Sequence, residues 1–162
     1  MKNKISINLE VSLVEIIISI LIFAIAGAIM LTCFAMARFT QIKANDMIFA
    51  GNIVQSAAEM IKSFDDMEEA EKYFTENYAV KNEAVNGITF MNYYDKSWSI
   101  CEKGNEAYFV SITIADSSIN KLKDIGITAK KIMPYPFIDK GKDISPLYKI
   151  ETRKFFLDSG RR

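Results

Sequence analysis

Residues 11–37 read Val-Ser-Leu-Val-Glu-Ile-Ile-Ile-Ser-Ile-Leu-Ile-Phe-Ala-Ile-Ala-Gly-Ala-Ile-Met-Leu-Thr-Cys-Phe-Ala-Met-Ala. A helix needs about 20 apolar residues to cross a hydrocarbon core about 30 Å thick, and this run is long enough and contains no proline. Its only charged residue is Glu15. Because a carboxylate at the bilayer centre costs roughly 2.5–3.5 kcal/mol on insertion scales, an acid in such a helix is a candidate functional residue.

A secretory signal peptide would have a shorter apolar part than this segment and would end in a cleavage site. Its apolar part is about 7–15 residues long and leads to a small-residue cleavage site, whereas this run continues to Arg38. Lys2 and Lys4 precede the run, and Arg38 and Lys43 follow it, so the positive-inside count does not orient it. The short polar N-terminus and the large C-terminal part favour a cytoplasmic N-terminus.

The first residues of the run, Val11-Ser12-Leu13-Val14-Glu15, resemble the N-terminal motif of type IV pilins and pseudopilins. The family signature is glycine, then Phe-Thr-Leu-Val-Glu, then a long apolar helix. In this resemblance Val11 is the first mature residue, Ser12 replaces threonine, and Glu15 is the signature acid. Residues 1–10 correspond to a leader that a prepilin peptidase removes before it methylates the new N-terminus. Glu10 occupies the position where the family has glycine, so the implied processing site is Glu10–Val11.

The resemblance implies a role in subunit assembly for Glu15, with Ser12, Leu13 and Val14 beside it. Its carboxylate would pair with the N-terminal amine of a neighbouring subunit, and opposite charges attract more strongly in low dielectric than in water. Another interpretation stays open, in which Glu15 lies near the interface and is hydrated by snorkelling or membrane thinning. In a filament, the helix bundle would bury an apolar set against neighbouring subunits: Leu13, Ile17, Ile20, Ile25, Gly27 and Ile29.

Residues 39–64 continue the helix with an amphipathic pattern. Apolar residues recur at spacings of three, four and seven, which is typical of one helical face. The stripe consists of Ile42, Phe49, Ile53, Ala57, Met60 or Ile61, and Phe64. We predict one helix over residues 11–64, about 80 Å long, with a transmembrane part (11–38) and an amphipathic extension (39–64). Gly27 and Gly51 are its expected soft points, and Gly27 could equally mark close helix–helix packing.

Residues 65–162 are expected to form an extracytoplasmic head. Asp65 or Asp66 can cap a short helix that ends near Asn77. The β-branched and aromatic runs beyond it are bounded by glycine, proline and Asp/Asn turns, which predicts an antiparallel meander. These runs are residues 88–94, 98–101, 107–114, 126–133 and 147–156, with 117–125 as a loop or short helical turn. The predicted fold class is α+β and pilin-like, with a long N-terminal helix packed on a small antiparallel sheet.

No catalytic constellation is visible in the sequence, so we predict that the protein is not an enzyme. Histidine is absent, which removes the commonest general base and metal ligand. A Gly-rich phosphate loop, a Cys-x-x-Cys pair and a Gly-x-Ser-x-Gly elbow are also absent. The acidic run at residues 65–69 lacks the glycine and closing ligand of a calcium loop, and it suits a helix N-terminus. We therefore expect no cofactor and no metal site.

The remaining candidate residues favour packing over chemistry. Cys33 and Cys101 are expected to be small hydrophobic residues without a disulfide. The chain has 20 basic and 20 acidic residues, so its net charge gives no general attraction to nucleic acid. Aromatic residues at strand spacing are expected to pack in the core or across strands, although a stacking face for carbohydrate or nucleic acid is the alternative. They are Tyr93, Tyr94, Trp98, Tyr108 and Phe109.

Together these features predict a structural subunit, either a minor pilin or a pseudopilin. It would assemble through its apolar helix into a pilus or pseudopilus used for adhesion, motility, secretion or DNA uptake. The implied partners are other pilin-like subunits, a prepilin peptidase, membrane lipid and an assembly platform, with nucleic acid only in a competence role. The expected location is the cell membrane, in a single pass with the head outside the cytoplasm, or extracellular in a filament. The alternative is a single-pass, signal-anchored surface protein that does not polymerise and whose head binds a ligand or partner.

Overall fold

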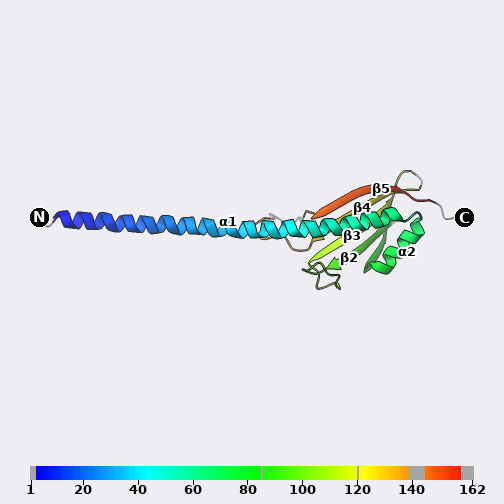
Figure 1. The fold of residues 1–162 in the computed structure, drawn as a ribbon, viewed down its shortest axis with the longest axis horizontal. Coiled ribbons are helices and arrows are strands. Elements are labelled where there is room, and N and C mark those ends of the chain that lie inside the picture. Colours follow the sequence, from blue (N-terminus) through cyan, green and yellow to red (C-terminus); the bar gives the residue numbers. More distant parts are fainter. Residues whose placement is uncertain (1–2, 85, 120, 139–144, 158–162) are drawn as a thin grey trace. The chain divides into compact units, whose positions relative to one another are not determined.

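The computed structural model describes residues 3–84, 86–119, 121–138 and 145–157, with side chains described from Leu13 onward. The chain divides into two compact units, Met1–Gln41 and Ile42–Arg162. Helices and strands follow one another in a simple order along the described residues (Figure 1). They are α1 (Asn3–Ser63), α2 (Met67–Asn77), β1 (Val80–Ala84), β2 (Gly87–Tyr94), β3 (Tyr108–Asp116), β4 (Leu122–Lys131) and β5 (Tyr148–Phe155).

Helix α1 is one helix of 61 residues, so the predicted continuity is confirmed. It begins at Asn3, within the predicted leader, and ends at Ser63. Neither Gly27 nor Gly51 interrupts it. Gly51 is buried, and a Cβ placed there would lie 3.6 Å from the ring of Tyr148 on β5, so the small residue allows close approach of helix and strand.

The five strands form one antiparallel sheet in the order β1-β2-β3-β4-β5. The predicted meander and the α+β class are therefore confirmed. The register aligns one apolar row across the sheet, in which Ile112 pairs with Phe90 and with Ile127, and Ile127 pairs with Ile150. Phe90, Ile112 and Ile127 are fully buried.

Three details of the strand prediction were wrong. Residues 98–101 are not a strand, and Ile100 makes only an isolated bridge with Tyr94. Residues 117–125 are not all connection, because β4 begins at Leu122. Strand β1 was not predicted, because it lies at the edge of the sheet and its sequence Val-Lys-Asn-Glu-Ala lacks the β-branched density of a central strand.

The amphipathic part of α1 covers one face of the sheet, as expected, through a stripe that shares Ala57 and Ile61 with the predicted one. Its buried positions are Ala50, Val54, Ala57, Ala58 and Ile61. Phe49 is instead 52 % exposed, and Ile42 and Met60 are each 37 % exposed. Alanine contributes little to an apolar pattern, yet it lets the helix lie close to the sheet, so Phe49, Ile42 and Met60 flank the contact while Val54 and Ile61 lie within it.

Two further contacts fix the helices to the sheet. Asp66 caps α2 as predicted, because its side chain accepts from the backbone N–H of Glu68 at 3.1 Å. Lys154 on β5 donates to the carbonyl oxygens of Ile61 (3.0 Å), Lys62 (2.6 Å) and Phe64. A cation at the C-terminal carbonyls of a helix satisfies groups that have no partner within the helix.

Candidate functional site

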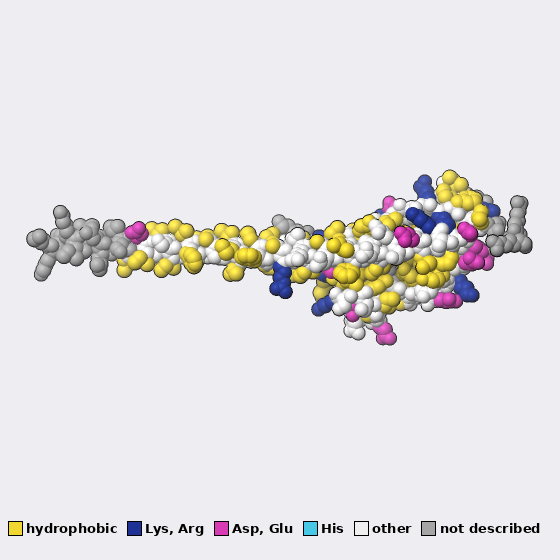
Figure 2. Space-filling view, viewed as in Figure 1, with side chains coloured by type: hydrophobic (Ala, Val, Ile, Leu, Met, Phe, Trp, Pro, Cys, Tyr) yellow, Lys and Arg dark blue, Asp and Glu magenta, His cyan; other side chains and the backbone are white. Residues whose placement is uncertain are grey.

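The N-terminal part of α1 presents mostly apolar side chains on its described surface. Hydrophobic side chains run along the face of this part of the helix that Figure 2 shows. Exposed side chains occur at every angle around the axis, for example Ile20 at 63 % and Phe23 at 81 %. A helix that is hydrophobic all round is normally buried in a protein core or a membrane. By length and composition, α1 could cross a membrane.

The predicted packing residues do not form one stripe. At about 100° per residue, Leu13, Ile17, Ile20 and Gly27 point to one side of α1, whereas Ile25 and Ile29 point to the other. Gly27 is half-buried and the other five are exposed. A Cβ built at Gly27 would meet nothing within 4 Å, so no described contact requires a glycine there. Lateral packing of this helix would involve neighbours on more than one side.

Glu15 is exposed among these apolar side chains, beside Leu13 and Val14, which are also exposed. The hydroxyl of Ser19 donates to the backbone carbonyl of Glu15 at 2.8 Å. Among the residues with described side chains, none donates to the Glu15 carboxylate. The side chains of Glu10, Val11 and Ser12 lie outside the described residues, although the backbone there belongs to α1.

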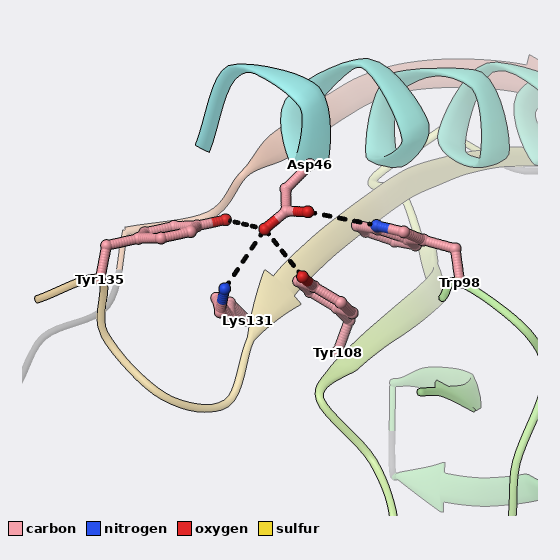
Figure 3. Close-up of polar contacts among 5 residues, drawn as sticks. All are labelled: Asp46, Trp98, Tyr108, Lys131 and Tyr135. Atoms are coloured by element: carbon pink, nitrogen blue, oxygen red, sulfur yellow. Dashed lines mark hydrogen bonds and ion pairs between the residues drawn. The ribbon is translucent and has the colours of Figure 1, made fainter. Parts of the chain in front are cut away.

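A second polar site lies in the other unit, around Asp46 of α1. Asp46 is only 7 % exposed. Its carboxylate accepts from the hydroxyl of Tyr108 at 2.7 Å, from the hydroxyl of Tyr135, and from the indole N–H of Trp98 at 3.5 Å. The ammonium of Lys131 lies 3.2 Å away. Figure 3 shows these four side chains pointing at the carboxylate from three directions, and we call the five residues the Asp46 cluster.

The buried carboxylate of Asp46 has both an ion-pair partner and hydrogen-bond donors. A buried charge is stable only when it is paired and hydrogen-bonded, and Asp46 has both kinds of partner. Burial and the hydrogen bond to Asp46 raise the pKa of Tyr108 well above its ordinary value of 10.0. The Lys131 ammonium also lies 3.8 Å from the centre of the Tyr135 ring, which adds a cation–π contact.

Aromatic stacking extends the Asp46 cluster. The rings of Trp98 and Tyr108 stack at 4.1 Å with an interplanar angle of 13°, and Phe49 lies 6.3 Å beyond Trp98. Tyr94 and Tyr108 are buried in the core, and Tyr93 is paired with Phe109 across β2 and β3. The predicted core or cross-strand packing of these aromatic residues is therefore confirmed.

The Asp46 cluster joins parts of the fold that are far apart in sequence. Trp98 belongs to the β2–β3 connection, Tyr108 to β3, Lys131 to β4 and Tyr135 to the segment after β4. Sequence analysis did not identify Asp46, because a single acid in an amphipathic helix normally faces solvent. Its polar partners lie 52–89 positions away, so no local spacing could reveal them.

Two grooves lie on the surface of the described head. One apolar groove of about 300 Å³ lies between α1 and α2, with Ile53, Met60 and Tyr73 among its lining residues. Another of about 530 Å³ lies on the outer face of β3, β4 and β5, beside Gly126 and Arg153. Among the described residues, no group of acids and cysteines is arranged to hold a metal, and both cysteines are free thiols.

No family model, curated protein or solved structure matches this chain. Its function is therefore inferred from the apolar segment of α1, from Glu15 and from the head.

Proposed function

We propose that this chain is a type IV pilin-like subunit, a minor pilin or pseudopilin, that assembles through α1 into a pilus or pseudopilus. The observation that carries the proposal is Glu15. It is the only charged residue between Leu13 and Ala37, and no described side chain donates to its carboxylate. A lone carboxylate in an apolar helix is costly in hydrocarbon, so a cation from outside the subunit would stabilise it.

The N-terminal amine of a second subunit supplies that cation in our proposal. Cleavage at Glu10–Val11 would create an amine four residues before Glu15. Because four helical residues rise about 6 Å, a parallel neighbour shifted by about one turn would place its amine beside Glu15. The same shift repeated from subunit to subunit is a heterologous contact that does not close, and such contacts build helical filaments.

Two features of the described fold support this proposal. Apolar side chains cover α1 on opposite sides, with Ile17 on one and Ile29 on the other, which suits a subunit surrounded by neighbours. The later part of α1 packs on a small antiparallel sheet and contributes to its hydrophobic core, as expected for a helix that carries a globular head. In this proposal the N-terminus is cytoplasmic, the head is extracytoplasmic, and the partners are sister subunits, a prepilin peptidase, membrane lipid and an assembly platform.

Glu15 variants test the assembly step. In cells that carry the native assembly machinery, Glu15→Leu should reduce the protein in the sheared filament fraction at least about tenfold, the equivalent of 1.4 kcal/mol. Glu15→Asp keeps the charge and should retain part of the assembly. Glu59→Leu removes an exposed acid elsewhere on α1 and should have no effect. Normal assembly of Glu15→Leu, with the protein still in the membrane, would contradict the pairing.

The alternative function is a signal-anchored surface protein that does not polymerise. Glu10 favours it, because a bulky charged residue replaces the glycine of the family at the processing site. In that case the leader stays attached, Val11 has no free amine, and Glu15→Leu leaves the cellular distribution of the protein unchanged.

A further inference from the structure

The described head has one end at which two connections meet α1. In an antiparallel meander, the β2–β3 connection (residues 95–107) and the β4–β5 connection (residues 132–147) leave the same end of the sheet. The first connection supplies Trp98 and the second supplies Tyr135, and both bond to the carboxylate of Asp46 (Figure 3). One buried acid therefore holds both connections against the helix.

These two connections carry large apolar side chains that are not buried. Ile100 is 69 % exposed in the first connection, and Met133 and Phe137 are 73 % and 59 % exposed in the second. Phe49, stacked beside Trp98, is 52 % exposed on α1. We call Phe49, Ile100, Met133 and Phe137 the apolar rim. Grouped exposed apolar residues on a folded surface mark an interaction site more often than isolated ones do.

We infer that the apolar rim is a lipid-contacting surface that lies in the interfacial region of a bilayer. The first reason is that this unit follows the apolar run directly along the chain. Ile42, the first residue of this unit, follows Ala37 by five positions, and Ala37 ends the apolar run. Five residues span at most about 18 Å even when fully extended. A membrane that takes up the apolar run therefore lies within reach of the connections next to Asp46.

The chemistry around the rim also suits a lipid interface. Aromatic side chains with a polar end and lysines with long apolar stems are the residues that occupy the headgroup level. Lys43 is such a residue, and its ammonium lies 5.4 Å from the Tyr135 ring centre. The polar ends of Trp98, Tyr135 and Lys131 are instead bonded to the buried Asp46. The nearby acids Asp95 and Glu106 accept from backbone N–H groups of their own connection.

The other end of the sheet provides a matched comparison. Ile119 in the β3–β4 connection is 60 % exposed, similar to the rim residues. Its groove is lined by the acids Asp66, Glu68 and Asp116 together with lysines. Ile119 and Ile100 are therefore the same residue type with similar exposure. The connection that carries Ile119, however, lies at the end of the sheet away from Asp46.

A fluorescent probe at single cysteines tests the inference on the full chain. Cys33→Ala and Cys101→Ser remove the native thiols, and Ile100→Cys, Met133→Cys, Ile119→Cys or Ile25→Cys then carries an environment-sensitive dye. The protein is reconstituted in vesicles of phosphatidylcholine and phosphatidylglycerol at low protein-to-lipid ratio. We expect blue-shifted emission at positions 100 and 133 that loses most of its intensity to lipids spin-labelled near the headgroup. Position 119 should remain water-like, and position 25 should be quenched by deep labels.

Each other outcome contradicts the inference and identifies the reason. Water-like emission at positions 100 and 133, with position 25 in lipid, would overturn the lipid contact and leave the proposed function intact. Water-like emission at position 25 would overturn the membrane location on which both rest. An apolar signal at the rim that spin-labelled lipid does not quench would assign the rim to a second copy of the chain. Equal quenching at position 119 would show that the head contacts lipid at both ends of the sheet and that the apolar rim is not a specific lipid-contacting surface.

Discussion

The carboxylate of Asp46 lies 2.7 Å from the hydroxyl of Tyr108, although the two residues are 62 positions apart. This contact joins α1 to β3 at the end of the sheet where two connections leave it. The hydrogen bond is directional, and it adds to the apolar contacts that Ala50 and Val54 make on the same side of α1.

We predict that Asp46→Asn lowers the free energy of unfolding by about 2–3 kcal/mol. The amide keeps the size of the side chain but leaves the Lys131 ammonium, whose side chain is 18 % exposed, without its counter-charge. Denaturant unfolding in detergent micelles, followed through the only tryptophan, Trp98, measures the loss. The control is Asp124→Asn, which breaks an exposed pair with Arg153 and should cost less than about 1 kcal/mol. Equal losses for the two variants would contradict a special role for Asp46.

The close approach of α1 to the sheet gives a second prediction. Ala50 is fully buried, so Ala50→Leu should overpack the contact and destabilise the fold by about 1–3 kcal/mol. Ala44 is an exposed alanine six residues earlier on the same helix, and Ala44→Leu should change stability by less than about 0.5 kcal/mol. The midpoint of denaturant unfolding compares the two. A neutral Ala50→Leu would mean that the helix does not lie against the sheet at this position.

Lys154 should stabilise the end of α1 through its three carbonyl contacts. Lys154→Met keeps the apolar stem and removes the charge, so we expect a loss of about 1–2 kcal/mol and faster amide exchange in the last turn of the helix. Lys149→Met on the same strand removes an exposed lysine that pairs with Glu151 at the surface. That control should change stability by less than about 0.5 kcal/mol. If both variants behave alike, Lys154 is an ordinary surface lysine.

Stability should fall as the pH rises above 10, because the buried Tyr108 and the partly buried Tyr78 resist ionisation. Burial raises the pKa of Tyr78 and of Tyr108 above the ordinary value of 10.0, and the hydrogen bond to Asp46 adds to the effect at Tyr108. The unfolded chain then loses protons that the folded chain keeps. The contribution is fully present below pH 10 and is lost above it, at no more than about 1.4 kcal/mol per pH unit for each tyrosine.

Tyr78→Phe isolates the part of this slope that comes from Tyr78. The phenylalanine preserves packing against Phe74, whose ring centre lies 5.3 Å away, and removes the ionisable hydroxyl. Unfolding curves at pH 8, 10 and 11 should show a shallower decline for the variant than for the unmodified chain. An unchanged slope would show that Tyr78 ionises equally in the folded and unfolded states.

The long helix and the meander could be predicted because their signals are local. Residues 11–64 contain no proline and repeat apolar residues at helical spacing, and strands β2, β3 and β5 are dense in β-branched and aromatic residues. The start of α1 at Asn3 was missed, because the polar residues before Val11 carry no helical apolar pattern. Strand β1 was missed for a similar reason, since an edge strand needs fewer apolar residues.

The contacts of the head could not be predicted, because they are distant in sequence. The apolar pattern gave Phe49 more weight than Ala50, yet packing buries the alanine and leaves much of the phenylalanine exposed. Asp46 has no sequence signal of its own, since its partners come from four separate segments of the fold. Glu15 could be singled out from the sequence alone, because a single acid inside a long apolar run is conspicuous without any tertiary information.

The measurement that tests the central claim most directly is the intact mass and N-terminal sequence of the protein recovered from membranes that contain the native prepilin peptidase. Our account predicts a chain that begins at Val11 with a methylated amine, because that amine is the proposed partner of Glu15. A chain that retains Met1–Glu10 would leave Glu15 without its partner and contradict assembly by this pairing.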